Sequence, residues 1–356
     1  MKGQPMIREN LTNSMMTTLL GCMRKYYYRY ELRLQHTSEK AALTFGSAWH
    51  RAMEARWQHQ TGEEALMMAV ADYQTLDELQ VATLTGLLTG YYHYYPKDPI
   101  IEMQPEQQFE FPLQGSRTFN SAGKIDGNGT HEDGRSVMME HKTTSDSVAP
   151  ESDYWLRLRC NNQIMMYVDA ARLCGLPTEV IYYDVTRKPT IRPKTISTLD
   201  EQGHKIVKDA SGQRIMKKDN TPRESGDIAK GYVVQTRLET NEEYCQRLTD
   251  DTITRPEFYF ARREVPVLDQ DLNEFLVQRL EIGRMILSLR RASRSTAKPY
   301  QAWPRNSGAM NCNFCEFKEP CLQNIELNPA QPPAGFIVGE RNPELAAKQG
   351  GTGNGH

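Results

Sequence analysis

The chain has 356 residues, of which 38% are hydrophobic and 25% are charged, so a packed core is feasible and global disorder is excluded. Its formal net charge is −2, which excludes a broadly basic surface and means that any grip on nucleic acid must be local. The opening MKGQPMIREN has no apolar core segment, and no run is long enough to span a membrane. A cytoplasmic protein is therefore expected, with its seven cysteines as thiols or metal ligands.

Helical patterns fill the first part of the chain, a subregion of about residues 10–100. One helix is predicted from Ser14 to Leu34 and another over residues 63–95. Between them, a helix from about Thr44 repeats large apolar side chains every four residues, which predicts one buried stripe formed by Trp49, Met53 and Trp57.

The texture then changes to short alternating segments separated by Gly, Asn and Asp, within a core of about residues 105–186. Three of them predict an antiparallel meander, namely residues 106–113, 118–130 and 136–144. A helix over residues 155–175, with Gly175 at its C-terminal cap, and a strand over residues 178–185 complete this core.

Residues 187–230 are polar and weakly periodic, which predicts either a flexible insertion or an extended hairpin. The segment is either a local grip on phosphate or a solvated loop, and its basic residues include Lys188, Arg192, Lys194, Lys217 and Lys218. Beyond it, the pattern predicts strands over residues 231–238 and 258–265, a long helix over 268–293, and a cysteine segment that ends near 325. Residues 1–325 are therefore expected to form one domain without an internal repeat, and 326–356 a flexible tail.

Three residues of the meander carry the first candidate chemistry. Because side chains alternate along a strand, Glu140 and Lys142 are expected on one face while His141 points away. Asp126 lies one hairpin earlier, so its carboxylate is expected to meet that of Glu140. Two carboxylates repel unless a cation lies between them, and hard oxygen ligands, with the His141 backbone carbonyl as a further one, suit Mg²⁺ or Mn²⁺. The alternative is an ordinary cross-strand ion pair of Glu140 with Lys142.

A second group of candidate ligands lies near the end of the chain. Cys312, Cys315 and Cys321 have the spacing C-x2-C-x5-C, one ligand short of a closed tetrahedral set. Both zinc and iron–sulfur clusters accept four thiolates, so the spacing leaves the two open. Cys160, Cys174 and Cys245 have no partner at ligand spacing and are predicted to be buried thiols.

Together, these motifs resemble the RecB-like branch of the PD-(D/E)xK phosphodiesterase superfamily. The resemblance includes G-x-x-x-H at Gly46 and His50, Q-x-x-x-Y at Gln163 and Tyr167, and a first cysteine, Cys22, ahead of the other three, in the order that the branch shows. It covers roughly residues 10–322 and is most similar to nucleases of the AddB and CRISPR-associated exonuclease type.

The resemblance implies an α/β fold with a restriction-endonuclease-like core, a central mixed sheet flanked by helices, between a helical N-terminal region and a C-terminal cysteine segment. It implies that His50, Asp126 and Glu140 hold the divalent ion, that Lys142 acts in phosphoester cleavage, and that Gln163 and Tyr167 contact substrate or orient the lysine. It further implies a structural [4Fe–4S] cluster on Cys22, Cys312, Cys315 and Cys321, with zinc as the alternative occupant.

The expected activity is that of a metal-dependent DNA nuclease, an exonuclease acting on single-stranded or frayed ends in phage or bacterial recombination and repair. The chain has no G-x-x-x-x-G-K-[ST] motif, so a helicase or other recombination partner would be a separate protein. The alternatives are a non-catalytic subunit that binds DNA ends and a nuclease that processes CRISPR spacers.

Overall fold

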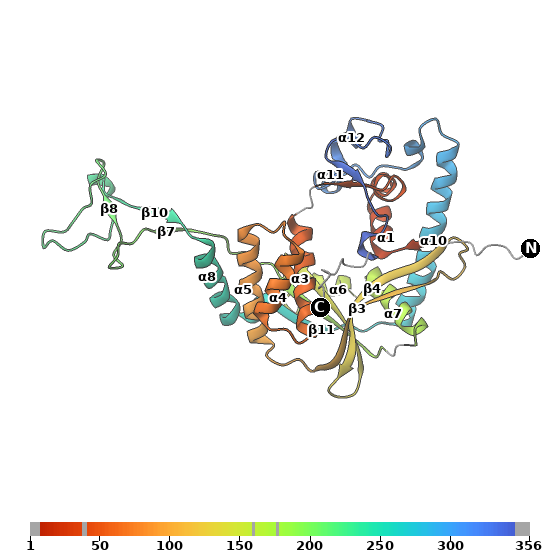
Figure 1. Ribbon diagram of the computed structural model, residues 1–356, viewed down its shortest axis with the longest axis horizontal. Helices are drawn as coiled ribbons and strands as arrows, with labels where there is room; N and C mark the ends of the chain where they lie inside the picture. The colour runs from red at the N-terminus through yellow and green to blue at the C-terminus, as the bar shows by residue number, and fades with distance from the viewer. Residues whose placement is uncertain (1–7, 38–40, 159–160, 176–177, 346–356) are drawn as a thin grey trace, which may run out of the picture.

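A computed structural model describes residues 8–37, 41–158, 161–175 and 178–345. Figure 1 shows a central sheet with helices on both sides, a slender arm projecting at one end, and the cysteine-bearing helices gathered near the N-terminal helix. The α/β architecture predicted from the sequence, a central mixed sheet flanked by helices, is confirmed. No helix among the described residues is long and apolar enough to cross a membrane.

The central sheet has six strands in the order β1–β4–β5–β6–β11, with β3 paired to the other edge of β4. The meander predicted from the sequence forms its middle, because β3–β4 and β4–β5 are antiparallel hairpins. β1 is parallel to β4, β6 is parallel to β5, and β11 is antiparallel to β6, so the sheet is mixed. The strands are β1 Glu9–Leu11, β3 Ile100–Pro112, β4 Phe119–His131, β5 Ser136–Thr144, β6 Val180–Arg187 and β11 Phe260–Glu264.

One face of the sheet is covered by a layer of helices from two parts of the chain. These are α3 Ala41–Trp57, α4 Gly62–Asp72, α5 Glu78–Tyr94, α8 Asn241–Thr254 and α9 Pro256–Tyr259. The predicted stripe is confirmed, since Trp49, Met53 and Trp57 are all buried. Helix α8 packs close to α5 because Gly90 has no side chain: a Cβ there would lie 2.2 Å from Oγ1 of Thr252.

The other face packs against α1, α7 and α10, whose apolar side chains join those of β4, β5 and β6 in the largest hydrophobic core. Three predicted helices are divided in the structure. The first forms three pieces, with Cys22 in an extended conformation between the first two, the helix predicted over residues 63–95 forms α4 and α5, and the one predicted over 155–175 forms α6 and α7. The elements are α1 Asn13–Gly21, α2 Met23–Tyr26, the π-helix η1 Tyr27–Glu31, α6 Asp153–Leu158, α7 Asn162–Leu173 and α10 Asp269–Arg294.

The C-terminal segment departs from the predicted flexible tail over residues 326–345. β12 (Phe336–Val338) pairs antiparallel with β2 (Leu34–His36), and the 3₁₀ turn η4 (Pro343–Leu345) lies against β4. The physical reason is a set of backbone and charged partners that the Pro/Gly-rich composition does not reveal. The remaining tail, residues 346–356, is outside the described part of the chain.

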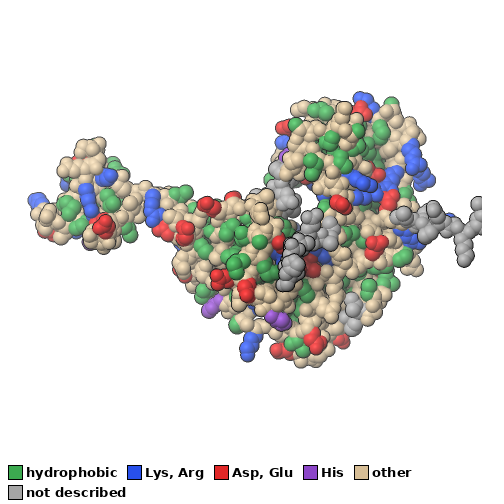
Figure 2. Space-filling model, viewed as in Figure 1, with side chains coloured by type: hydrophobic (Ala, Val, Ile, Leu, Met, Phe, Trp, Pro, Cys, Tyr) green, Lys and Arg blue, Asp and Glu red, His purple; other side chains and the backbone are tan. Residues whose placement is uncertain are grey.

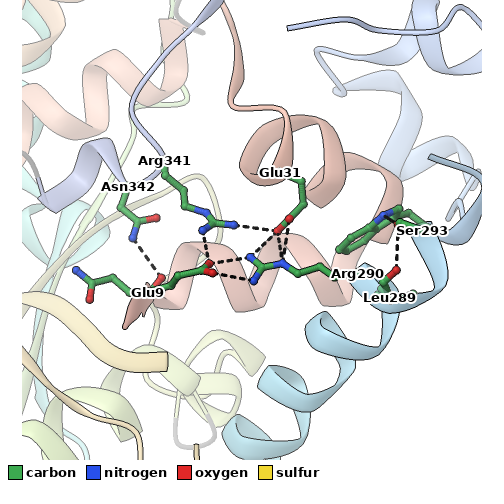
Figure 3. A network of polar contacts seen from close by, with 9 residues as sticks. Glu9, Glu31, Leu289, Arg290, Ser293, Arg341 and Asn342 are labelled. Carbon is green, nitrogen blue, oxygen red and sulfur yellow. Dashed lines mark hydrogen bonds and ion pairs between the residues drawn. The ribbon is translucent and has the colours of Figure 1, made fainter. Parts of the chain in front are cut away.

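Four charged residues hold this segment in place, and we call them the latch: Glu9, Glu31, Arg290 and Arg341 (Figure 3). Arg290 of α10 donates to Glu9 at 2.8 and 3.0 Å and to Glu31 at 2.8–3.1 Å. Arg341 bonds to both carboxylates as well, at 2.9 Å in the case of Glu31. The latch therefore joins β1, η1, α10 and the C-terminal segment with charge-assisted hydrogen bonds.

We expect Glu9→Gln to destabilise the protein at neutral pH and to have little effect in acid. Burial raises the pKa of Glu9, but its hydrogen bond to Arg290 and the charge of Arg341 outweigh this, so the pKa lies below its ordinary value of 4.5. A carboxylate with a lowered folded-state pKa contributes stability above its unfolded pKa and loses it as the pH falls through the folded value. Urea unfolding between about pH 3 and 7 measures this. A stability difference between wild type and variant that is constant with pH would contradict it, and Glu110→Gln is the control.

Residues 188–238, which we call the arm, connect β6 to α8 and project from the molecule (Figure 1). They form short antiparallel pairs, β7 with β10 and β8 with β9. The strand predicted over residues 231–238 is present as two short strands, β9 and β10, which pair within the arm and not with the central sheet. The elements are β7 Thr195–Ser197, β8 Val207–Lys208, η2 Ile228–Lys230, β9 Val233–Val234 and β10 Thr236–Leu238.

Candidate active site and cysteine cavity

The candidate active site lies where two strands of the sheet part. The β4–β5 ladder ends at the pair Gly127–Met139, and β1 pairs with the same edge of β4 only as far as Ser121. Asp126 and Glu140 are therefore the first residues beyond the last pair. The Asp126 carboxylate accepts the backbone N–H of His141 at 2.9 Å, which uses a donor that the parting of the strands leaves open to it.

His50 reaches this opening from α3. Its Nδ1 lies 3.2 Å from Oδ2 of Asp126, and its side chain is 29% exposed while that of Asp126 is 10% exposed. The structure thus brings together an imidazole from residue 50 and a carboxylate from residue 126, as the sequence predicts. Gly46, one turn earlier on α3, lies close to Thr143 of β5.

Glu140 and Lys142 lie on the face of β5 opposite to that of His141, as the alternation of side chains along a strand predicts. Glu140 is fully buried, and its Oε1 pairs with Nζ of Lys142. Lys142 also donates to Oε1 of Gln163 at 2.8 Å, and Nε2 of Gln163 donates to the Tyr167 hydroxyl at 2.7 Å. Both partners belong to α7 at a spacing of four residues, so one helix face aims the glutamine at the lysine.

Burial and mutual charge shape the ionisation of the site. Burial lowers the pKa of His50. The negative charge of Asp126 and the hydrogen bond to it together raise the pKa by more than burial lowers it, so the pKa lies above its ordinary value. Burial raises the pKa of Asp126, but the charge of His50 outweighs this and the pKa lies below the usual range. For Glu140, burial and then the negative charge of Asp126 raise the pKa, and Lys142 offsets part of the rise. The two carboxylates therefore oppose each other's charge.

The donor set suits a divalent cation in its chemistry. Oε2 of Glu140 is buried without a hydrogen-bond partner in the described part of the chain, beside a second carboxylate and an imidazole. Such an oxygen is costly to leave unpaired, and hard oxygen donors with one imidazole fit Mg²⁺ or Mn²⁺. In the arrangement described, however, Asp126 contacts the His50 ring and Glu140 contacts the Lys142 ammonium, and no three His, Cys, Asp or Glu side chains of the described residues are grouped as ligands of one ion.

A small cavity of about 190 Å³ adjoins the site. Its lining includes Asp126, Gln163 and Tyr167, together with Lys124 of β4 and Glu344 of η4. Glu344 also accepts a hydrogen bond from Thr12 at 2.6 Å, which fixes the C-terminal turn at the cavity wall. Sequence reasoning missed Glu344, because it lies in the segment predicted to be a flexible tail.

A buried polar network on the α3 face of the sheet was missed by the sequence analysis. The ring of His141 accepts from Trp57 Nε1 at 3.0 Å and lies 3.2 Å from Asp184. Asp184 is also bonded to Tyr91 and, at 3.2 Å, to Arg262. Burial raises the pKa of Asp184, but the charge of Arg262 outweighs this and the pKa lies below the usual range. An aspartate within the apolar run VIYYDV is the signal that would have revealed it.

The four predicted cluster ligands, Cys22, Cys312, Cys315 and Cys321, line a second cavity of about 280 Å³, which we call the cysteine cavity. Cys22 stands at the break between α1 and α2, and the others belong to or flank α11 (Ala309–Asn313) and α12 (Lys318–Leu322). Lys25, Arg305 and Lys318 line the same cavity, so cationic side chains surround the thiols. Burial raises the pKa of Cys315 and of Cys321. Four thiols in a cationic cavity fit the donor chemistry of an anionic iron–sulfur cluster and of four-thiolate zinc.

The tyrosine run beside Cys22 packs inward. Tyr26, Tyr28 and Tyr30 are all at least 96% buried, and the Tyr28 ring lies 5.3 Å from that of Phe317 in the cysteine segment. Behind it, Arg24 donates to the Trp303 carbonyl at 3.0 Å, beside the 3₁₀ turn η3 (Pro299–Ala302). These three rings help to hold the cysteine segment to the N-terminal helices, and their burial excludes them from stacking on the bases of DNA.

Two of the remaining cysteines differ from the buried thiols that the sequence predicts. Cys174 is exposed because it forms the C-terminal cap of α7, and Cys245 is partly buried on α8. Cys160 lies outside the described residues.

The chain belongs to the PD-(D/E)XK nuclease superfamily, whose model matches residues 10–322. The match includes the parted strands and all the candidate site residues. No curated protein matches the chain.

Two solved structures are similar to it at low identity. A candidate exonuclease from Eubacterium rectale is 11% identical, with a TM-score of 0.33 over 70% of this chain and 81% of that one. The protein SSO0001 is 12% identical, with a TM-score of 0.21 over 62% of this chain and 78% of that one.

Proposed function

We propose that the protein is a metal-dependent DNA nuclease, and that it removes nucleotides from single-stranded or frayed ends. The observation that carries the proposal is the meeting of Asp126, Glu140 and Lys142 at the parted strands, with His50 against Asp126. Membership of a nuclease superfamily supports hydrolysis of a phosphodiester. Recombination or repair of phage or bacterial DNA, with a separate helicase, is the setting that we infer.

His50, Asp126 and Glu140 would hold Mg²⁺ or Mn²⁺, with the His141 carbonyl as a further ligand. When bound, such an ion supplies a Lewis acid for the scissile phosphate and lowers the pKa of a water molecule. Lys142 would orient the attacking water and balance the negative charge that develops on the phosphate. Its hydrogen bond to Gln163 keeps the ammonium at the opening, and the Tyr167 hydroxyl fixes the glutamine in turn.

The four cysteines would hold a [4Fe–4S] cluster that ties the first helix to the C-terminal segment, with zinc as the rival occupant. Because Cys22 precedes the other three cysteines by almost 300 residues, the bound group would close a loop of nearly the whole chain. Anaerobic purification followed by visible absorption and by iron, sulfide and zinc analysis distinguishes the two. A colourless protein with four-thiolate zinc would remove the cluster from the proposal and leave the nuclease in place.

End-labelled DNA tests the nuclease activity. Single strands, blunt duplexes and duplexes with frayed ends, labelled at either terminus, are incubated with Mg²⁺, with Mn²⁺ and with EDTA. We expect metal-dependent shortening, fastest on single strands and frayed ends. Intact DNA in every sample, bound equally by wild type and by Asp126→Asn, would instead identify a non-catalytic subunit that binds DNA ends.

Gln163→Ala is expected to slow cleavage by about 10- to 100-fold, because the Lys142 ammonium loses the acceptor that positions it. Tyr167→Phe, which removes only the hydroxyl that fixes Gln163, is expected to have a smaller effect. Single-turnover rates at saturating DNA measure both changes. Gln246→Ala on the exposed face of α8 is the control, and an unchanged rate for Gln163→Ala would show that the lysine needs no such support.

A further inference from the structure

The arm is built from repeated tight turns that the sequence analysis did not detect. Asp200 and Asp209, nine residues apart, each accept backbone N–H bonds from the residues two and four positions later, at 2.8–3.0 Å. Asp219 makes the first of these bonds in a third turn, at 3.1 Å. A residue with positive φ follows at equivalent places, Gly203 and Gly212 at 84°. In the third turn, which begins at Lys217, Asn220 takes that place at 65°, because its backbone N–H bonds to the carbonyl three residues earlier as those of the two glycines do.

The turns leave the arm with an excess of positive charge. Residues 188–238 contain eleven Lys or Arg against six Asp or Glu, an excess of five, in a chain whose net charge is −2. Four of the six acids are engaged: Asp209 and Asp219 in their turns, and Asp200 and Asp227 in ion pairs with basic residues of the arm. Six basic side chains have no ion-pair partner in the described part of the chain, namely Arg192, Lys194, Lys205, Lys208, Lys217 and Lys218.

The base of the arm is fixed to the helical layer that carries His50. Arg247 of α8 donates to Glu239 at 2.6 and 2.8 Å and to the Arg192 carbonyl at 2.9 Å. α8 packs on α5 through the close contact at Gly90, and Tyr91 of α5 meets Trp49, the neighbour of His50, with ring centroids 5.6 Å apart. A chain of packed contacts therefore joins the arm to the site. Figures 1 and 2 show the arm extending outward from this layer, with Lys and Arg side chains on its surface.

We propose that the arm binds the phosphate backbone of DNA that extends beyond the end held in the active site. This rests on the proposed function and adds a binding surface to it. Exposed lysines contribute to such binding by releasing counterions from the phosphates, which depends on charge and not on base sequence. The arm thereby supplies a local positive surface on a chain whose net charge is −2. It lengthens the footprint on DNA without touching the bond that is cut.

The test replaces the arm's charges and compares short with long DNA. The variant carries Lys205→Gln, Lys208→Gln, Lys217→Gln and Lys218→Gln, and a control with the same loss of charge carries Lys97→Gln, Arg117→Gln, Arg291→Gln and Arg294→Gln. Dissociation constants are measured in EDTA by fluorescence anisotropy over a series of salt concentrations, for an oligonucleotide too short to reach the arm and for a long one.

For long DNA, we expect the arm variant to bind at least roughly tenfold more weakly than the control, with a salt slope smaller by about 3, since each lost phosphate contact accounts for about 0.7–0.9. Short DNA should bind equally to both, and its cleavage rate at saturation should be unchanged. Equal affinity and equal slope of the two variants on long DNA would overturn the proposal. Because binding is measured without cleavage, this outcome is separate from a failure of nuclease activity.

A protein partner is the competing use of the arm, through exposed apolar side chains such as Ile228 and Val233, which are 96% and 59% exposed. Sedimentation velocity of wild type and arm variant detects self-association, and loss of association with unchanged DNA affinity would overturn the proposal.

A second variant protects the test against local misfolding. It replaces residues 196–237 by Asn-Gly, because Thr195 and Leu238 are directly paired and a two-residue turn can join them. It should weaken binding of long DNA as the charge variant does.

Discussion

Asp126→Asn and Lys142→Met are each expected to lower the rate of DNA cleavage by roughly 10²–10³-fold or more, the effect of removing one charged or hydrogen-bonding group from a preorganised site. Asparagine keeps the shape of Asp126 and an oxygen able to accept the His141 N–H, but it removes the negative charge that faces His50. Methionine keeps most of the Lys142 stem and removes the ammonium beside Glu140. Single-turnover cleavage of labelled single-stranded DNA with Mn²⁺ measures both losses.

The control for these variants is Asp133→Asn, which alters an exposed aspartate in the turn between the same two strands. It should cleave DNA at the wild-type rate. Circular dichroism and thermal unfolding establish that the site variants are folded, which matters for Lys142→Met because it leaves a buried carboxylate without its partner. Folded variants that cleave at the wild-type rate would show that these residues form only a structural ion-pair network.

Cys315→Ser is expected to give the largest loss of stability among single substitutions outside the core. It would remove one of four ligands and with it the bound cluster or metal, so the N-terminal helices and the C-terminal segment would lose their link. A lost cross-link between distant parts of a chain typically costs about 2–5 kcal/mol. The unfolding midpoint should then fall by roughly 5–10 °C. Metal content, visible absorption and calorimetry measure the change.

Cys174→Ser is the matched control, because Cys174 is exposed at the end of α7 and is not among the residues that line the cysteine cavity. It should leave both metal content and unfolding midpoint unchanged. If Cys315→Ser also left them unchanged, the four cysteines would be ordinary thiols, and the aromatic packing of Tyr28 and Phe317 with the other contacts of this region would hold it together.

The elements that the sequence predicts well are those with a strong local period. The meander of β3, β4 and β5 follows from alternation and turn residues, and so does the shared face of Glu140 and Lys142. The stripe on α3 follows from a four-residue repeat, and its register carries His50 to Asp126. Where local pattern and tertiary packing agree, single-sequence reasoning reaches the candidate site.

The elements that it misses depend on distant partners. Residues 336–345 have no strong propensity, and they are ordered against β2 and the latch by groups some 300 positions away. The break at Cys22 and the network around Asp184 likewise arise from contacts with other segments. The arm's repeat was missed because it lies in spaced Asp and Gly residues rather than in hydrophobic periodicity.

The most direct test of the central claim is the anomalous scattering of Mn²⁺ in crystals of the protein soaked with the ion. The proposal predicts one strong peak at the parted strands, with His50, Asp126 and Glu140 as its protein ligands and Lys142 Nζ displaced from Glu140. A manganese peak only at another place would contradict it. So would crystals soaked at saturating Mn²⁺ in which Lys142 and His50 are still paired to the two carboxylates and no ion lies between them.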